Sequence, residues 1–341
     1  MSAIHRNTLK CNKGVTMVEL MVAMLLGLVV VGGATSVIVA NRQSYRTNEA
    51  LAQVQESART AFELLARDIR QAGSTGCDNT GRVGSVLKAS SNWWQNWGGI
   101  TGFDGATTDP AVTTGTNVAE RVAGTHSLQI RGTEGTGLSV ETHDPTSANF
   151  KINAASPQIQ INDVLIVCDF DHATIFQVSN YNSNNVTVVH NTGAGPSPGN
   201  CSKGLGFPTD CSSTNGNAYT FGPNSQVARF SAVSWYIGNN GRANEGGRSL
   251  YRRRLGSGAS LITEEVVAGV QNLQLGYRVD GSTAFVAPSA VAAADWATVN
   301  AVQLTLTMTS ADARVSTAPG TNNGRIERTF THLVTLRNRV P

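Results

Sequence analysis

The feature that most constrains this chain is an uncharged, mostly apolar stretch of 22 residues from Leu20 to Asn41. As an α-helix with a rise of about 1.5 Å per residue it would be about 33 Å long, close to the hydrocarbon thickness of a bilayer. Arg6, Lys10 and Lys13 precede it, and residues 1–14 hold no acidic side chain. Because flanking positive charge stays on the cytoplasmic side, we expect the chain after this stretch to be exported.

Two simpler interpretations of this stretch leave observations unexplained. An ordinary secretory signal has a shorter apolar core and a small-residue cleavage site, which residues 34–36 could supply. The apolar run nevertheless continues through residues 37–39, and Glu19 stands at its beginning, where a signal peptide normally has no acid. A plain membrane anchor also leaves Glu19 without a reason.

The sequence KGVTMVEL, from Lys13 to Leu20, resembles the class III signal of type IV prepilins. That signal has a short basic leader, a Gly, and a hydrophobic helix with Glu at its fifth position. In that family a membrane aspartyl peptidase cleaves after the Gly and methylates the new amino terminus. The resemblance implies cleavage between Gly14 and Val15, where the family usually has Phe after the cut. Gly suits such a peptidase because no side chain keeps the backbone away.

Glu19 acquires a role in this interpretation. A carboxylate near hydrocarbon is costly and needs a partner. Cleavage would create a positive α-amine at Val15, one helical turn from Glu19. In an assembling fibre the amine of a neighbouring subunit would pair with this carboxylate and set the axial register. The alternative is a glutamate that only extends its side chain to the membrane surface.

An apolar stripe predicts that the helix continues past the membrane segment. Its members recur every three or four positions: Leu51, Val54, Ala58, Phe62, Leu65, Ile69 and Ala72. Gly73 fits a C-terminal stop. A helix from Val15 to Ala72 would be about 87 Å long, which no compact domain of this size hides. Half of it should therefore lie in a membrane or fibre core, and the other half should pack on the globular part.

Several segments resemble the PilW family of minor pilins. They lie near the two ends of the chain, at residues 42–51, 61–73, 270–277, 296–304 and 330–339. The resemblance implies a structural protein rather than an enzyme, with no cofactor. It implies partners among other minor pilins, the major pilin, the prepilin peptidase and a large tip adhesin.

The rest of the chain reads as β-strands and long loops. Alternating apolar residues predict strands around residues 233–237, 273–279, 302–308 and 330–336. Three further runs, 164–167, 174–178 and 186–190, suggest an antiparallel meander. Tracts 74–126 and 191–225 are rich in turn residues, and neither marks a second domain. We expect an α+β fold in which the amphipathic half-helix lies across an antiparallel sheet with long loops.

Cysteine usage agrees with export. Of five cysteines, Cys11 lies in the expected leader, which leaves Cys77, Cys168, Cys201 and Cys211. Four cysteines in an oxidising compartment allow two disulfides in three pairings. The short Cys201–Cys211 loop is favoured, and Cys77–Cys168 would then tie the end of the helix to the sheet. A zinc site is the alternative, but the chain has no CxxC pair and its histidines are scattered, so we expect no metal.

Three other clusters have a structural and a functional interpretation. Residues 252–254 are three consecutive arginines, which would bind an anionic partner or, in our preferred interpretation, form a solvated strand edge. Three tryptophans, Trp93, Trp94 and Trp97, would stack on sugars, form a partner hot spot, or build a small core under a loop. Asp169, Asp171 and His172 would hold a cation or simply form a turn. The Gly spacing of residues 132–137 does not match a dinucleotide fingerprint.

Charge and domain layout complete the expectation. Only 14% of residues are charged, and the net charge of +3 resides in residues 1–14, so nucleic-acid binding is not expected. We expect a cleaved leader (1–14), a transmembrane and fibre-core half-helix (15–41), an amphipathic half-helix (42–73) and a periplasmic β-rich domain (74–341). The protein would reside in the inner membrane and then in the fibre at the cell surface.

The function that follows is that of a minor pilin, which helps to start a type IV pilus and is incorporated in it or at its tip, for twitching motility or adhesion. A minor pseudopilin of type II secretion is the first alternative, because those proteins share the N-terminal signal. A membrane-anchored periplasmic glycan-binding protein or enzyme is the second. No nucleophile elbow, HExxH or Walker motif supports an enzyme.

Overall fold

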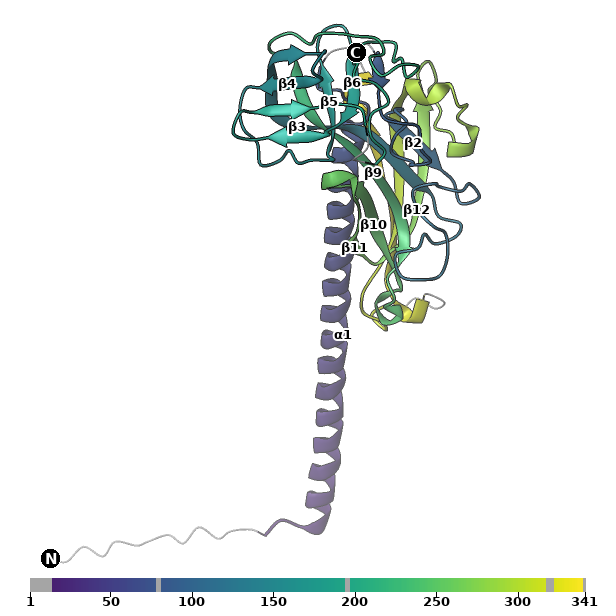
Figure 1. Ribbon diagram of the computed structural model, residues 1–341. Coiled ribbons are helices and arrows are strands. Elements are labelled where there is room, and N and C mark those ends of the chain that lie inside the picture. The colour runs from purple at the N-terminus through teal and green to yellow at the C-terminus, as the bar shows by residue number, and fades with distance from the viewer. Residues whose placement is uncertain (1–13, 78–80, 194–196, 317–321, 340–341) are drawn as a thin grey trace, which may run out of the picture.

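The structure is a computed structural model that describes residues 14–77, 81–193, 197–316 and 322–339. Most of the expected leader, including Cys11, lies outside these residues. One long helix, α1, projects from a β-rich domain that encloses only its C-terminal part (Figure 1). The α+β class expected from the sequence is confirmed: one long, N-terminally apolar helix precedes a mostly antiparallel β-domain.

Helix α1 spans Met17–Arg70, 54 residues, two short of the expected bounds at each end. Its first half is solvent-exposed throughout, and its second half buries one face in the domain. The buried residues are Ala50, Val54, Ala58, Ala61, Phe62, Leu65, Ala66 and Ile69. They recur at the three- and four-residue spacing of an amphipathic helix, as the sequence predicts.

The larger sheet has eleven strands and surrounds the long central strand β9 (Gln226–Asn239). Its main path runs β1-β6-β5-β9-β3-β4-β8-β7. These strands are β1 (Val83–Ser85), β3 (Ser127–Asp144), β4 (Asn149–Ile152), β5 (Val164–Cys168), β6 (Ala173–Gln177), β7 (Asn180–Asn182) and β8 (Thr187–Val189). Off this path, β2 (Ile100–Phe103) pairs with β3, and β10 (Arg248–Leu255) lies between β9 and β11 (Leu261–Ala268).

A second sheet of three antiparallel strands, β12 (Val270–Val279), β13 (Val299–Thr309) and β14 (Glu327–Thr335), lies against the helix. The strands pair in the register Leu275↔Leu304 and Leu304↔His332. One core holds α1 between apolar side chains of this sheet and of β3, β9 and β10. The remaining helical segments are single 3-10 turns: Ala243–Glu245, Ser257–Ala259, Pro288–Ala290, Asp295–Thr298, Asn322–Gly324 and Arg337–Arg339.

Beside a small cluster of Ala50, Val315 and Ile326, two larger satellite cores complete the domain. One lies on the face of β3 and β9 opposite the helix, under a loop that contains Trp93 and Trp94. The other gathers Phe150, Phe176 and Phe221 among β3, β4, β5, β6 and β8. Because successive side chains of a strand point to opposite faces, the long strands β3 and β9 contribute to more than one of these cores.

The expected strands around 164–167, 174–178, 186–190, 233–237, 273–279, 302–308 and 330–336 are confirmed. Of the expected antiparallel meander, the pairing of β5 with β6 is confirmed. Its third strand is wrong, because β8 pairs with β4 and β7 rather than with β6. The edge interpretation of residues 252–254 is also wrong. They lie in β10, which pairs with β9 on one side and β11 on the other.

Candidate assembly site and its anchoring to the domain

The N-terminus of α1 has a reciprocal cap formed by Thr16 and Glu19. The Thr16 side chain accepts a hydrogen bond from the Glu19 backbone N–H at 3.3 Å. The Glu19 carboxylate accepts from the Thr16 backbone N–H at 3.0 Å and from its hydroxyl at 2.9 Å. This is a capping box, which satisfies two helix-terminal donors at once. Thr16 was not singled out in the sequence, although the T-x-x-E spacing is its signature.

The surroundings of Glu19 are open and apolar. Val15 and Met17 are 73% and 82% exposed, and no atom comes within 4 Å of a Cβ built on Gly14. The helix is long and apolar enough to cross a membrane, and its most apolar window has no buried residue. Fifteen exposed Leu, Val, Ile and Met side chains on one helix cannot be stable in water alone, so they require an apolar surrounding.

The polar side chains inside the apolar half are satisfied by the helix itself. The Thr35 hydroxyl donates to the carbonyls of Val31 and Gly32, both at 2.9 Å. The Ser36 hydroxyl donates to the carbonyl of Gly33 at 2.7 Å. Such bonds remove the cost of placing a hydroxyl in hydrocarbon. Glu19 is the only side chain from residue 15 to residue 41 that can carry a charge.

The domain holds the amphipathic half at three levels. Near its beginning, Thr47 donates its hydroxyl to the Val315 carbonyl at 2.7 Å. In the middle, the Phe62 ring packs on His332 of β14 with centroids 4.0 Å apart. Near its end, the indole N–H of Trp235 donates to the Asp68 carboxylate at 2.8 Å. The helix is therefore fixed to the loop before β14, to β14 itself and to β9.

Asp68 carries an ionisable carboxyl group that is half-buried at the border of the apolar core. Burial raises the pKa of Asp68, and the hydrogen bond from Trp235 and the charges of Arg252 and Arg67 oppose that effect. The hydrogen bond between Asp68 and Trp235 was not predicted from the sequence, because 167 positions separate the two residues.

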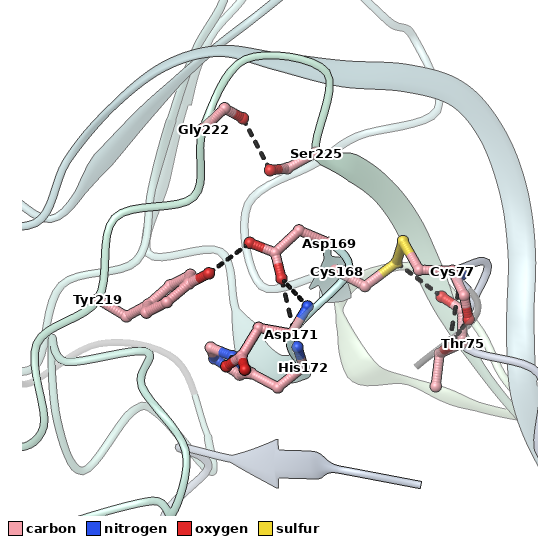
Figure 2. The surroundings of a disulfide bond; sticks show 9 residues. All are labelled: Thr75, Cys77, Cys168, Asp169, Asp171, His172, Tyr219, Gly222 and Ser225. Carbon is pink, nitrogen blue, oxygen red and sulfur yellow. Dashed lines mark hydrogen bonds and ion pairs between the residues drawn. A yellow bond between two sulfur atoms is a disulfide. The ribbon is translucent and has the colours of Figure 1, made fainter. Parts of the chain in front are cut away.

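The four cysteines left after the expected leader form two disulfides in the structure. Cys77, just after the helix, is bonded to Cys168 at the end of β5, with Cα atoms 5.9 Å apart (Figure 2). Cys201 is bonded to Cys211, with Cα atoms 5.3 Å apart. This is the pairing that the sequence favours. The first bond ties the end of α1 to the larger sheet, and the second closes a ten-residue loop.

Asp169, Asp171 and His172 form the turn between β5 and β6, as one of the two interpretations held. Asp169 accepts hydrogen bonds from the backbone N–H groups of Asp171 and His172 and from the Tyr219 hydroxyl, the last at 2.7 Å (Figure 2). The ring of His172 is buried, with Nδ1 2.8 Å from an Asp171 oxygen and Nε2 2.8 Å from the Leu205 carbonyl. Within the described residues no three His, Cys, Asp or Glu side chains gather as metal ligands.

The other singled-out clusters have structural partners. Arg252 and Arg254 both bind Glu264 of β11, at 2.7 and 2.9 Å, and Arg253 points the other way to donate to the Ala111 carbonyl. Trp93 and Trp94 are buried in a satellite core, as one of the interpretations held, and Trp97 is half-buried beside Phe230. These three tryptophans are near the end of α1 in sequence, but they lie on the opposite face of the sheet.

Comparison with protein families gives two matches. Residues 234–338, from within β9 to within the last 3-10 turn, match the family described as Type IV Pilus-assembly protein W, PilW. Residues 9–35 match the prokaryotic N-terminal methylation motif, which includes Gly14, Val15 and Glu19. No curated protein and no solved structure matches the chain. The two family matches support a PilW-family, prepilin-like protein.

Proposed function

We propose that the chain is a minor pilin that helps to start a type IV pilus and is incorporated in the fibre or at its tip. One observation carries the proposal. A single carboxylate, Glu19, lies at the beginning of an exposed apolar helix, five positions into the chain that cleavage after Gly14 would leave. The match of residues 9–35 to the methylation motif supports that cleavage.

The geometry suggests how cleavage changes the chemistry of this end. Before cleavage, the Glu19 carboxylate is used by its own Thr16 cap. Cleavage would turn the Val15 amide into an amine that carries positive charge close to that cap. A carboxylate has four lone-pair sites, so Glu19 can keep the cap and still accept a bond from the amine of a neighbouring subunit. In a water-free fibre core such a charge pair would be strong and would fix the offset between subunits.

The proposed layout follows from these roles. Residues 1–14 would be the leader, residues 15–41 the membrane and fibre-core segment, residues 42–73 the amphipathic half, and residues 74–341 the periplasmic domain. The protein would wait in the inner membrane with its domain in the periplasm. Its partners would be other minor pilins, the major pilin, the prepilin peptidase and a tip adhesin, and the role is structural rather than catalytic.

The experiment that tests the proposal is mass spectrometry of the N-terminus of the protein in sheared pili. We expect a mature chain that begins at N-methylated Val15. A chain that retains residues 1–14, or one cut near residues 34–36 by a signal peptidase, would refute the proposal.

A minor pseudopilin of type II secretion is the second candidate, because it would have the same processed helix. Deletion of the gene separates the two: loss of twitching motility with normal secretion supports the pilus, and loss of secretion with normal twitching supports the pseudopilin.

A further inference from the structure

A pocket lies on the face of β2 and β3 that is turned away from α1. Ile100, Leu128 and Ile130 of these strands pack with the helix. Their neighbours Thr101, Gln129 and Arg131 point to the other face and line the pocket. A subunit whose helix enters a fibre core would therefore keep this pocket on its outer side.

The pocket has the size and lining of a small-molecule site. Its volume is about 380 Å³, within the range of about 300–1,000 Å³ found for ligand sites. Rings and short polar side chains alternate around it. The lining residues used below are Asn92, Trp93, Asn96, Trp97, Phe103 and Arg131. Trp97 and Phe103 are half-buried and Asn96 is exposed, so part of the aromatic lining is accessible.

Arg131 is a buried cation held in place by neutral groups. It is 5% exposed, and it donates to the Trp93 carbonyl at 2.6 Å and to the side-chain oxygen of Gln129. Gln129 in turn donates to the Asp109 carboxylate at 2.6 Å, which fixes its oxygen toward Arg131. No carboxylate forms a salt bridge with Arg131 among the described residues. Burial lowers the pKa of Arg131 to about 10, which still leaves it protonated at neutral pH.

Two donors of the pocket lining have no acceptor. In the part of the chain that the structure describes, Nε of Arg131 and Nε1 of Trp93 are buried without a hydrogen-bond partner. The Trp93 ring also lies against the guanidinium, 5.9 Å from its centroid to Cζ. An unsatisfied buried donor costs about 1–3 kcal/mol. An acceptor group that entered the pocket and reached either donor would remove that cost.

We propose that this pocket binds an acidic carbohydrate, a sugar ring that carries a carboxylate. The Arg131 guanidinium supplies the positive charge that pairs with the carboxylate. Because its Nη2 already donates to Trp93 and Gln129, Nη1 is the group that would donate to one carboxylate oxygen. The faces of Trp97 and Phe103 cover the apolar C–H face of the ring. Asn92 and Asn96 bind hydroxyl groups, since an amide both donates and accepts. The volume of the pocket fits one or two sugar rings better than an extended peptide.

The experiment uses the full chain in detergent micelles and follows tryptophan fluorescence during titration with trigalacturonic acid. The matched probe is its methyl ester, which keeps the ring and removes the charge. We expect saturable binding of the acid, and binding of the ester weaker by about tenfold or more. Equal binding of acid and ester, or no saturable signal with either up to millimolar concentrations, would overturn the proposal.

Variants locate the binding. Trp97→Ala and Asn96→Ala are each expected to weaken binding of the acid by about fivefold or more, and Asn96 is exposed enough to be replaced without disturbing the fold. Phe170→Ala removes a 90% exposed ring at the β5–β6 turn and is the matched control, which should bind as the wild type does. Unchanged affinity in both Trp97→Ala and Asn96→Ala refutes the site. Displacement of the sugar acid by inorganic phosphate or tetraglutamate at equal concentration would show an anion or peptide site instead and would also refute the proposal.

Discussion

The indole N–H of Trp235 lies 2.8 Å from a carboxylate oxygen of Asp68 and so joins the last turn of α1 to the middle of β9. Trp235 is fully buried and belongs to the same core as the helix, whereas Asp68 is half-buried at its border. Cys77 and Cys168 fasten the same end of the helix covalently. Force transmitted along α1 would therefore reach the larger sheet through this hydrogen bond and the disulfide as well as through the shared apolar core.

The first prediction concerns Asp68. Asp68→Ala removes the acceptor of a buried N–H and should lower the free energy of unfolding by about 1–3 kcal/mol. Asp68→Asn keeps an acceptor oxygen and removes the buried charge, so it should be as stable as the wild type, or more so, at neutral pH. Thermal unfolding of the purified protein in detergent compares the two. Equal destabilisation by both variants would contradict the role given to the hydrogen bond.

The pH dependence of Asp68→Asn has a defined sign. Because burial raises the pKa of Asp68, the folded protein holds this proton more tightly than the unfolded chain does. The unfavourable contribution of the carboxylate is thus present above the raised pKa and disappears as the pH falls through it. The advantage of the Asn variant over the wild type should shrink as the pH falls toward the ordinary pKa of an aspartate.

The second prediction concerns two buried histidines. His143 Nε2 and His190 Nε2 lie 3.3 Å apart among Phe150, Phe176 and Phe221. His143 Nδ1 accepts from the Phe221 N–H, so its proton resides on Nε2 and is donated to His190. Burial lowers the pKa of His143 to about 4 and of His190 to about 3. Both rings are therefore neutral in the folded protein at neutral pH.

Acid should destabilise the protein through this pair. The unfolded chain takes up protons below the ordinary histidine pKa of about 6.5, whereas the folded protein does so only near 4 and 3. The stabilising contribution is complete above pH 6.5 and is lost as the pH falls toward 4. His190→Gln removes one such proton and should flatten the dependence by about 1.4 kcal/mol per pH unit. Parallel stability curves for wild type and variant between pH 7 and pH 4.5 would refute this.

The third prediction ranks the disulfides. Cys77–Cys168 closes a loop of 91 positions and Cys201–Cys211 one of 10. Chain entropy gives the longer loop about 4–5 kcal/mol and the shorter one about 2–3 kcal/mol. The double variant Cys77→Ser with Cys168→Ser should thus unfold more readily than Cys201→Ser with Cys211→Ser. The order is tested by thermal unfolding of both double variants, and the reverse order would contradict it.

Local patterns in the sequence predicted much of this structure. The helix, its buried stripe and seven strand regions follow from local sequence patterns, because burial on one face requires a fixed spacing. The pairing of β8 with β4 could not be predicted, since the partner of a strand depends on the path of the whole chain. Gly135 and Gly137 obscured the alternation within β3. The three arginines Arg252–Arg254 obscured β10, where Arg252 and Arg254 share one carboxylate, Glu264 of a neighbouring strand.

Some of the functional residues could likewise be predicted from the sequence, and others became visible only in the structure. Gly14, Val15 and Glu19 lie within six consecutive residues, so the sequence alone is enough to predict them as a site. The Thr16 cap lies in the same six residues and could have been predicted from them. Arg131 and Trp93 are 38 positions apart and meet only because the loop before β2 folds over β3. A buried arginine without a carboxylate partner has no local sequence signal, which is why that pocket became visible only in the structure.

The fourth prediction concerns Glu19. Glu19→Gln keeps an acceptor for the Thr16 cap, so the helix should begin normally and the chain should still be cleaved after Gly14. It removes the charge that would pair with the amine of a neighbouring subunit in apolar surroundings, where loss of one partner of a charge pair is most costly. We expect normal amounts in the membrane and at least about a tenfold loss from sheared pili, a difference equivalent to about 1.4 kcal/mol.

The matched control for this prediction is Glu56→Gln, which removes an exposed acid farther along the same helix. It should be incorporated as the wild type is, because its carboxylate lies outside the apolar half. Quantitative immunoblots of membrane and sheared fractions measure both variants. If Glu19→Gln enters pili normally, Glu19 only extends to the membrane surface. If Glu19→Gln is not cleaved although Glu56→Gln is, the change acts on recognition by the peptidase. Only normal cleavage with selective loss of Glu19→Gln from the fibre supports pairing of this carboxylate with a neighbouring amine.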